Sequence, residues 1–143
     1  TANDITDVRA RYVSDPYVIR DEADWYMLFG VRNSDTRQGD IGLATSTDGL
    51  AWKYQKIILD EPFHLSCPPF KWQGEYYLLP ESPDSGSIRL YKAMDFPYRW
   101  TLFATLLQGN YADPSLFRHN GMWWMLAESN PDGDDRLALL ICP

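Results

Sequence analysis

Hydrophobic residues in this chain fall in short runs that are interrupted by Gly, Asn, Asp and Pro. Residues 24–31 and 75–81 are examples, and both are rich in aromatic or aliphatic side chains bounded by turn-forming residues. Such runs are typical of β-strands joined by tight turns. No segment carries an apolar stripe of helical period with capping residues, and ten prolines are spread along the chain. The pattern therefore predicts an all-β protein.

The pattern repeats three times. SDPYVIRDEADWYMLF begins at Ser14, SCPPFKWQGEYYLLPES at Ser66 and ADPSLFRHNGMWWMLAES at Ala112. Asp15, Cys67 and Asp113 align, with spacings of 52 and 46 residues. These spacings are those of β-propeller blades and not of helical repeats.

Each unit predicts antiparallel strands joined by hairpins. In the first unit we expect strands at 15–20, 24–31, 40–46 and 52–59, and the second unit matches it. The third unit has only three predicted strands. The hairpin turns are DEAD, WQGE and HNGM, of which Asn120-Gly121 is the most specific, because both residues tolerate a positive φ.

We therefore predict one partial β-propeller domain of four-stranded blades, with about two and a half to three blades in the chain. The blade units are 14–59, 66–107 and 112–143, and residues 1–13 supply a closing strand, drawn from Thr6 to Val13. Propellers have about four to eight blades, so two flanks are left open. A homodimer of five or six blades would close the ring; the alternative is that the sequence is a fragment of a longer propeller.

Composition narrows the classes of partner. The formal net charge of −7 and the scattered Lys and Arg residues argue against binding to nucleic acid or to an anionic membrane. No apolar run has the roughly 20 residues of a membrane helix. Two cysteines, Cys67 and Cys142, do not make a disulfide framework, which favours a cytoplasmic chain over a secreted one. The sequence does not begin with Met, so secretion stays open. We expect no metal and no cofactor, since NPDGDDR lacks the pattern of a calcium loop.

Several motifs resemble a known group of proteins. The Asp-Pro strands and GDIGLATSTDG followed by Trp52 resemble five-bladed β-propellers of glycoside hydrolase family 43 and the invertase-like group. LDEPFHLS, YYLLPES, RLYKA and FPYRW, at residues 59–66, 76–82, 89–93 and 96–100, are closer to the propeller domain of glucosamine inositolphosphorylceramide transferase-like proteins. The resemblance covers nearly the whole chain but only about half of a propeller.

The family 43 resemblance implies a base, a pKa modulator and an acid on successive first strands. Asp15 matches the base. Cys67 stands at the second position, where the pKa modulator is an Asp. Asp113 stands at the third position, where the acid is a Glu, so two of the three positions depart from the pattern.

The first strand of every propeller blade lines the central axis, so we expect Asp15 and Asp113 to face one funnel. An inverting glycosidase uses two carboxyl groups, one as general acid and one as general base, which lie about 6.5–9.5 Å apart. Asp15 and Asp113 would supply such a pair if they have this separation. The alternative is that an Asp before Pro only stabilises a turn through its own backbone.

Three further residues are candidates at the same funnel. Glu81, in PES, and Glu128, in AES, are placed identically in two blades, so either can be structural and bond the backbone of a neighbouring blade or an Arg such as Arg89. Glu81 is also a catalytic candidate, whereas for Glu128 the structural role is favoured. His64 has an ordinary pKa near neutrality and is a candidate acid, base or sugar ligand. Cys67 is a candidate ligand-binding residue, and a buried, unreactive thiol is the alternative.

Most aromatic residues are expected to pack between blades. Tyr17, Trp72 and Tyr111 lie near the first strands or their loops, so they are candidates for stacking against a sugar. Two functions stay open: a carbohydrate-recognising propeller related to glycoside hydrolases, with hydrolysis at the funnel, or a non-catalytic structural or protein-binding half-propeller.

Overall fold

The computed structural model describes residues 1–61, 68–81, 85–129 and 136–142 and is built almost entirely of β-strands. The strands form three antiparallel sheets, in the orders β1-β2-β3-β4, β5-β6-β7-β8 and β11-β10-β9, called here the first, second and third sheet. Their bounds are β1 (Ala10–Asp21), β2 (Asp24–Asn33), β3 (Gly39–Ser46), β4 (Lys53–Leu59), β5 (Phe70–Trp72), β6 (Glu75–Leu78), β7 (Ser87–Asp95), β8 (Arg99–Gln108), β9 (Tyr111–His119), β10 (Met122–Ser129) and β11 (Arg136–Cys142).

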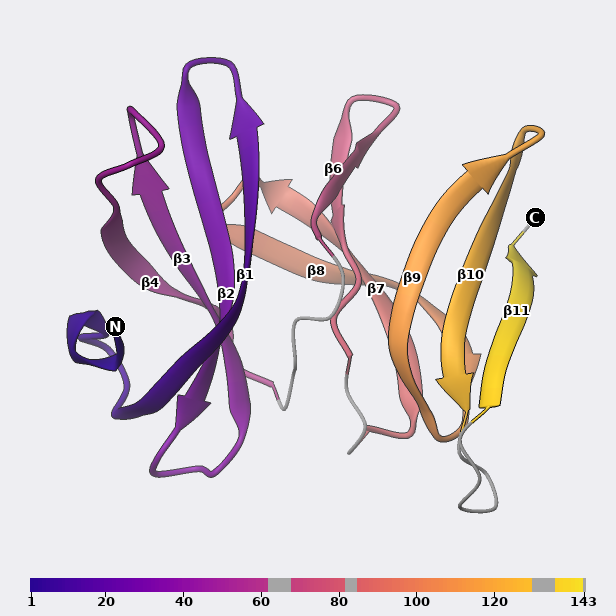
Figure 1. Cartoon of the computed structure of the whole chain (residues 1–143), viewed down its shortest axis with the longest axis horizontal. Coiled ribbons are helices and arrows are strands. Elements are labelled where there is room, and N and C mark those ends of the chain that lie inside the picture. The colour runs from indigo at the N-terminus through magenta and orange to yellow at the C-terminus, as the bar shows by residue number, and fades with distance from the viewer. Residues whose placement is uncertain (62–67, 82–84, 130–135, 143) are drawn as a thin grey trace.

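The three sheets stand side by side, with the second between the other two (Figure 1). In each sheet the first strand is an edge strand. β1 and β9 lie on the inner sides of their sheets and run in the same direction, and the hairpins that end β1, β5 and β9 all lie at the top of the view (Figure 1). The hairpins between the first two strands of the three sheets therefore lie at the same end of the molecule in this view.

The predicted all-β class and the predicted hairpins are confirmed. Glu22, Gln73 and Asn120 in the three turns have φ values of 53°, 50° and 50°, and Gly74 and Gly121 follow with φ values of 85° and 80°. β1 differs most from its predicted bounds. It begins at Ala10, because the strand continues through an irregularity between Ser14 and Tyr17 that the sequence pattern takes for its start.

Two hydrophobic cores join the sheets. Between the first and second sheets, Leu28, Ile41 and Leu43 pack with Leu78 and Tyr91. Between the second and third sheets the core has the buried members Leu79, Ile88, Met125 and Ala127. Because each core takes residues from two sheets, burial of apolar area holds neighbouring sheets together.

The N-terminal segment lies on the first sheet. Residues 10–13 belong to β1, whereas the sequence prediction gave 6–13 to the missing strand of the third sheet. Ile5 and Val8 pack against the outer face of the first sheet with Phe29 and Val31. Asp7 fastens this segment, since its carboxylate accepts hydrogen bonds from the Tyr54 hydroxyl and, at 2.7 Å, from the Ile57 amide.

The N-terminal element η1 (Ala2–Asp4) is a three-residue 3-10 helix, and the described residues contain no helix that is long and apolar enough to span a bilayer.

Candidate functional site

The two Asp-Pro motifs form the same irregularity in the first and third sheets. The register of β1 against β2 shifts between Ser14 and Tyr17, and that of β9 against β10 shifts at the corresponding place. Asp15 has a φ of 50° and Asp113 a φ of 47°, both in the left-handed region. Asp tolerates this region better than most residues, and bulges of this kind re-aim a side chain. Both carboxylates are on exposed residues, far along their strands from the hairpin turns.

Glu81 holds the bulge at Asp113. Its Oε2 accepts a hydrogen bond of 3.0 Å from the Asp113 backbone amide, so a residue that follows β6 fastens the first strand of the third sheet. This contact is the structural alternative that the sequence offered for Glu81. The strand registers make Gly30, Glu81 and Glu128 equivalent in the three sheets. Where the other sheets carry Glu, the first sheet has Gly30, and a Cβ there would lie 4.0 Å from Asp15 Oδ2.

The structure brings together some of the predicted site residues. Glu81 and Asp113 are joined directly, and Asp15 occupies the position equivalent to Asp113 in the first sheet. His64 and Cys67 lie outside the described residues, so their roles stay predictions. Tyr17 and Tyr111 are partly buried in the two cores between sheets.

Trp72 lies at the opposite ends of the strands from the Asp-Pro bulges. It belongs to the hairpin between β5 and β6 and meets Trp123 edge to face, with ring centroids 5.5 Å apart. The structure therefore separates Trp72 from Asp15 and Asp113 along the strand direction.

Sequence reasoning missed a polar cluster at the start of the link between the first and second sheets. Glu61 Oε2 accepts hydrogen bonds from Arg89 Nη1 at 3.1 Å and from the Tyr91 hydroxyl at 3.2 Å. Arg89 Nε also donates to Ser87 Oγ at 3.1 Å. Arg89 thus pairs with Glu61, whereas the sequence offered Glu81 or Glu128 as its partner. The sequence did contain a signal for this cluster, because Glu61 and Arg89 both belong to the motifs that carry the family resemblance.

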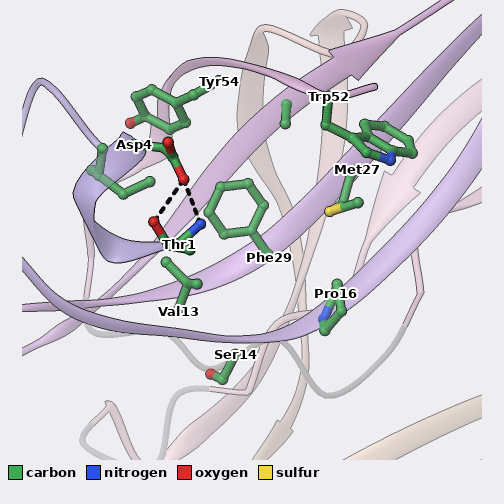
Figure 2. A pocket seen from close by; sticks show the side chains of 11 residues that line it. Thr1, Asp4, Val13, Ser14, Pro16, Met27, Phe29, Trp52 and Tyr54 are labelled. Atoms are coloured by element: carbon green, nitrogen blue, oxygen red, sulfur yellow. Dashed lines mark hydrogen bonds and ion pairs between the residues drawn. The ribbon is translucent and has the colours of Figure 1, made fainter. Parts of the chain in front are cut away.

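A cavity of about 290 Å³ lies between η1 and the outer face of the first sheet (Figure 2). Ser14 and Pro16, the neighbours of Asp15, line one side of it, and Phe29, Trp52 and Tyr54 line the rest with other residues. Burial raises the pKa of the Tyr54 hydroxyl, and the bond to Asp7 adds to that rise, so the tyrosine is neutral at physiological pH. Asp15 itself is not among the lining residues.

No cluster of three or more His, Cys, Asp or Glu side chains that could hold a metal ion occurs among the described residues.

Comparison with known proteins agrees with this arrangement of repeated sheets. The family model described as "Glucosamine inositolphosphorylceramide transferase 1, N-terminal" matches residues 1–136. The chain belongs to this family. A glucosamine inositolphosphorylceramide transferase 1 of Oryza sativa subsp. indica is 38% identical over 120 residues, which are 82% of this chain and 16% of that protein. The chain thus spans about one-sixth of the length of this relative.

Solved structures give the fold. A family 32 β-fructofuranosidase of Bombyx mori superposes with a TM-score of 0.68 at 20% identity, over 90% of this chain and 33% of the other. A Bacillus subtilis arabinanase superposes with a TM-score of 0.62 at 18% identity, over 90% of this chain and 50% of the other. The three sheets are therefore blades of a glycoside hydrolase-like β-propeller.

Proposed function

We propose that this domain recognises a carbohydrate at the end of the blades where the Asp-Pro bulges lie. One observation carries the proposal: Asp15 and Asp113 share the same unusual backbone conformation at equivalent places in two blades. Strained backbone of this kind persists where the surrounding structure enforces it, and it is concentrated at functional sites. The two residues are exposed at equivalent places in their blades, and carboxylates suit the hydroxyl groups of a sugar, which donate hydrogen bonds to them.

The relatives support a carbohydrate as the ligand class. The family is named after a glucosamine transferase, and the neighbours in structure include glycoside hydrolases. Fold alone does not carry function from one protein to another, so the proposal depends on the two bulges and not on the superposition.

In this proposal Glu81 is a positioning residue, because its carboxylate is occupied in fastening the Asp113 bulge. Hydrolysis is a second candidate, favoured by the survival of Asp15 at the position of the family 43 base. The departure at Asp113 and the use of Glu81 as a backbone acceptor favour binding over turnover.

The test is a glycan array with labelled protein, followed by titration of the best glycan and by an assay of 4-nitrophenyl glycosides. Asp15→Asn and Asp113→Asn keep the side-chain shape and tolerate the positive φ, so the fold should survive. We expect each to weaken glycan binding at least about tenfold, as for loss of a charge-assisted hydrogen bond. Asp24→Asn, on an exposed residue at the hairpin end of the first blade, is the matched control and should bind normally.

Unchanged binding in both Asp15→Asn and Asp113→Asn would contradict the proposed site. Turnover of an aryl glycoside that disappears in Asp15→Asn would establish the hydrolytic candidate. No binding to any glycan by the wild type would favour the non-catalytic structural or protein-binding role.

A further inference from the structure

The first strand of each sheet carries a cation at the same position. Arg20, Lys71 and Arg118 are each the last residue but one of their strand, and each stands opposite an aromatic residue of the second strand. All three are exposed, and each lies over an aromatic ring, at 5.2, 4.6 and 4.2 Å from its centre. The overall composition of this acidic chain, with a formal net charge of −7, does not account for a cation repeated at one register position.

Two of these cations share a cavity. Lys71 of β5 and Arg118 of β9 line a cavity of about 260 Å³ between the second and third sheets. Pockets for drug-sized ligands have about 300–1,000 Å³, so this cavity suits a smaller ligand such as one sugar ring. The rest of its lining is apolar and consists of Pro68, Phe70, Leu116 and Trp123.

The aromatic wall of the cavity is held in place by its neighbours. Phe70 packs between Tyr77 and Trp123, with ring centroids 5.6 and 5.5 Å away. Trp123 also meets Trp72 edge to face at 5.5 Å. Because contacts from both sheets fix these rings, the wall is formed before any ligand arrives, which lowers the entropic cost of binding.

The charges in the cavity are only partly compensated. Arg118 Nη2 donates to the Gly121 carbonyl at 3.1 Å, and the guanidinium lies over the Trp72 ring. Within the part of the chain that the structure describes, no carboxylate pairs with Arg118. Lys71 pairs with Asp21 of the first sheet at 3.2 Å. An anionic group in the cavity would therefore supply the counter-charge that Arg118 lacks.

We propose that this cavity binds a monosaccharide unit that carries an anionic group, either a carboxylate or a phosphate. The anionic group pairs with Arg118, whose planar guanidinium can donate two parallel hydrogen bonds to it, and with Lys71. The apolar face of the sugar ring lies against Trp123 and Leu116. A neutral sugar gains no charge-assisted hydrogen bond here, and a small inorganic anion leaves the apolar wall uncovered, so both should bind more weakly.

This is a second site, separate from the Asp-Pro bulges. Arg118 lies beside the hairpin that ends β9, whereas the bulge at Asp113 lies near the opposite end of that strand. Neither Asp15 nor Asp113 lines the cavity. The acidic sugar proposed here would also be repelled by those carboxylates, so the two ends of the blades suit ligands of different charge.

The test titrates D-glucuronate, glucose 6-phosphate, methyl β-D-glucoside and inorganic phosphate into ¹⁵N-labelled protein. We expect saturable shifts of the Trp123 indole N–H and the Arg118 Nε–H signals with at least one of the two acidic sugars. The neutral glucoside and inorganic phosphate should bind at least about tenfold more weakly than that sugar, as for loss of a charge-assisted hydrogen bond or of the apolar contact. The tighter of the two acidic sugars identifies the anionic group.

Variants at the repeated cation locate the ligand. Arg118→Gln removes the charge from an exposed side chain and should weaken binding of the acidic sugar at least about tenfold. Arg118→Lys keeps the charge but loses the planar fork, so its affinity should lie between the two. Arg20→Gln is the matched control: Arg20 has the equivalent position in the first sheet, also lies over a ring, and does not line the cavity, so this variant should bind as the wild type does.

Four results would each overturn the proposal: no saturable shift with either acidic sugar, equal affinity for the neutral glucoside or for inorganic phosphate, wild-type binding in Arg118→Gln, or an equal loss in Arg20→Gln. Failure here leaves the bulge site untouched. Glycan binding that depends on Asp15 and Asp113 should persist in Arg118→Gln, and binding of the acidic sugar should persist in Asp15→Asn and Asp113→Asn.

Discussion

At the scale of single residues, Asp40 shows how a buried carboxyl is tolerated. It is 2% exposed on β3, and its Oδ2 accepts a hydrogen bond of 2.9 Å from Asn33 Nδ2. Asn33 Oδ1 in turn accepts a hydrogen bond of 2.9 Å from the backbone amide of Asp35. Asn33 and Asp40 together therefore stabilise the turn between β2 and β3. Burial is the largest cause of the raised pKa of Asp40, and the hydrogen bond from Asn33 offsets only part of it.

This pKa leads to a prediction about pH. In the unfolded chain the carboxyl titrates near 3.8, whereas in the fold its pKa is higher, so the folded state holds the proton more tightly. The stabilising contribution of protonated Asp40 is therefore lost as pH rises from about 3.8 through the raised pKa. Asp40→Asn keeps a polar side chain beside Asn33 without the charge. We expect it to be at least as stable as the wild type at pH 7 and to lose this part of the pH dependence.

Urea denaturation at several pH values between 4 and 7 measures this effect. Asp35→Asn, an exposed residue in the same turn, is the control and should follow the wild-type profile. A clear loss of stability in Asp40→Asn at pH 7, by about 1 kcal/mol or more, would show that the ionised carboxylate stabilises the turn.

At the scale of elements, the hairpins between the first two strands of each sheet are the parts of the chain whose backbone conformation the local sequence determines most strongly. Asn120-Gly121 follows β9 with φ values of 50° and 80°. A Cβ on Gly121 would meet no heavy atom within 4 Å, so the glycine is needed for its backbone conformation and not for space.

Gly121→Ala should therefore destabilise the protein by about 1 kcal/mol through strain at positive φ alone. Chemical denaturation measures the change, and Ser115→Ala, on an exposed residue of β9, should shift the midpoint by much less. If Gly121→Ala has wild-type stability, the hairpin adopts a different turn.

At the scale of the whole molecule, the outer face of the third sheet is exposed. Leu137, Leu139 and Phe117 are 74%, 56% and 41% exposed. The outer face of the first sheet has the cavity of Figure 2 beneath the N-terminal segment. Large exposed apolar faces mark association surfaces. We propose that two chains place these two flanks against each other, so that the ring of blades is closed around one axis.

Light scattering on the isolated chain tests the association. Since one chain has a mass of 16.6 kDa, the expected mass is about twice that value. Leu139→Lys should shift the mass to that of the monomer, because it buries a charge at the interface, whereas Leu50→Lys, at an 87% exposed position between β3 and β4, should not. A wild-type monomer at micromolar concentration would contradict the closed dimer and would favour a propeller completed within a longer chain.

Features that depend on neighbours in sequence could be predicted from the sequence by itself: the three repeats, the strands within them and the turns that join them. Asn-Gly and the alternating apolar runs set local backbone conformation, and the register of Asp15 with Asp113 follows from repeat spacing. The equivalence of Gly30, Glu81 and Glu128 also follows from that alignment. These are short-range properties, so they need no knowledge of how the sheets pack.

Only the tertiary structure decided which partner each polar side chain takes. Glu81 fastens the Asp113 bulge, Arg89 pairs with Glu61, and the N-terminal segment covers the first sheet instead of completing the third. Each of these contacts joins residues far apart in the sequence, and several acceptors of the same chemistry were available to each donor. The choice among these acceptors depends on which sheets face each other and on how their strands are offset. Packing of the whole fold sets both, and no local sequence pattern does.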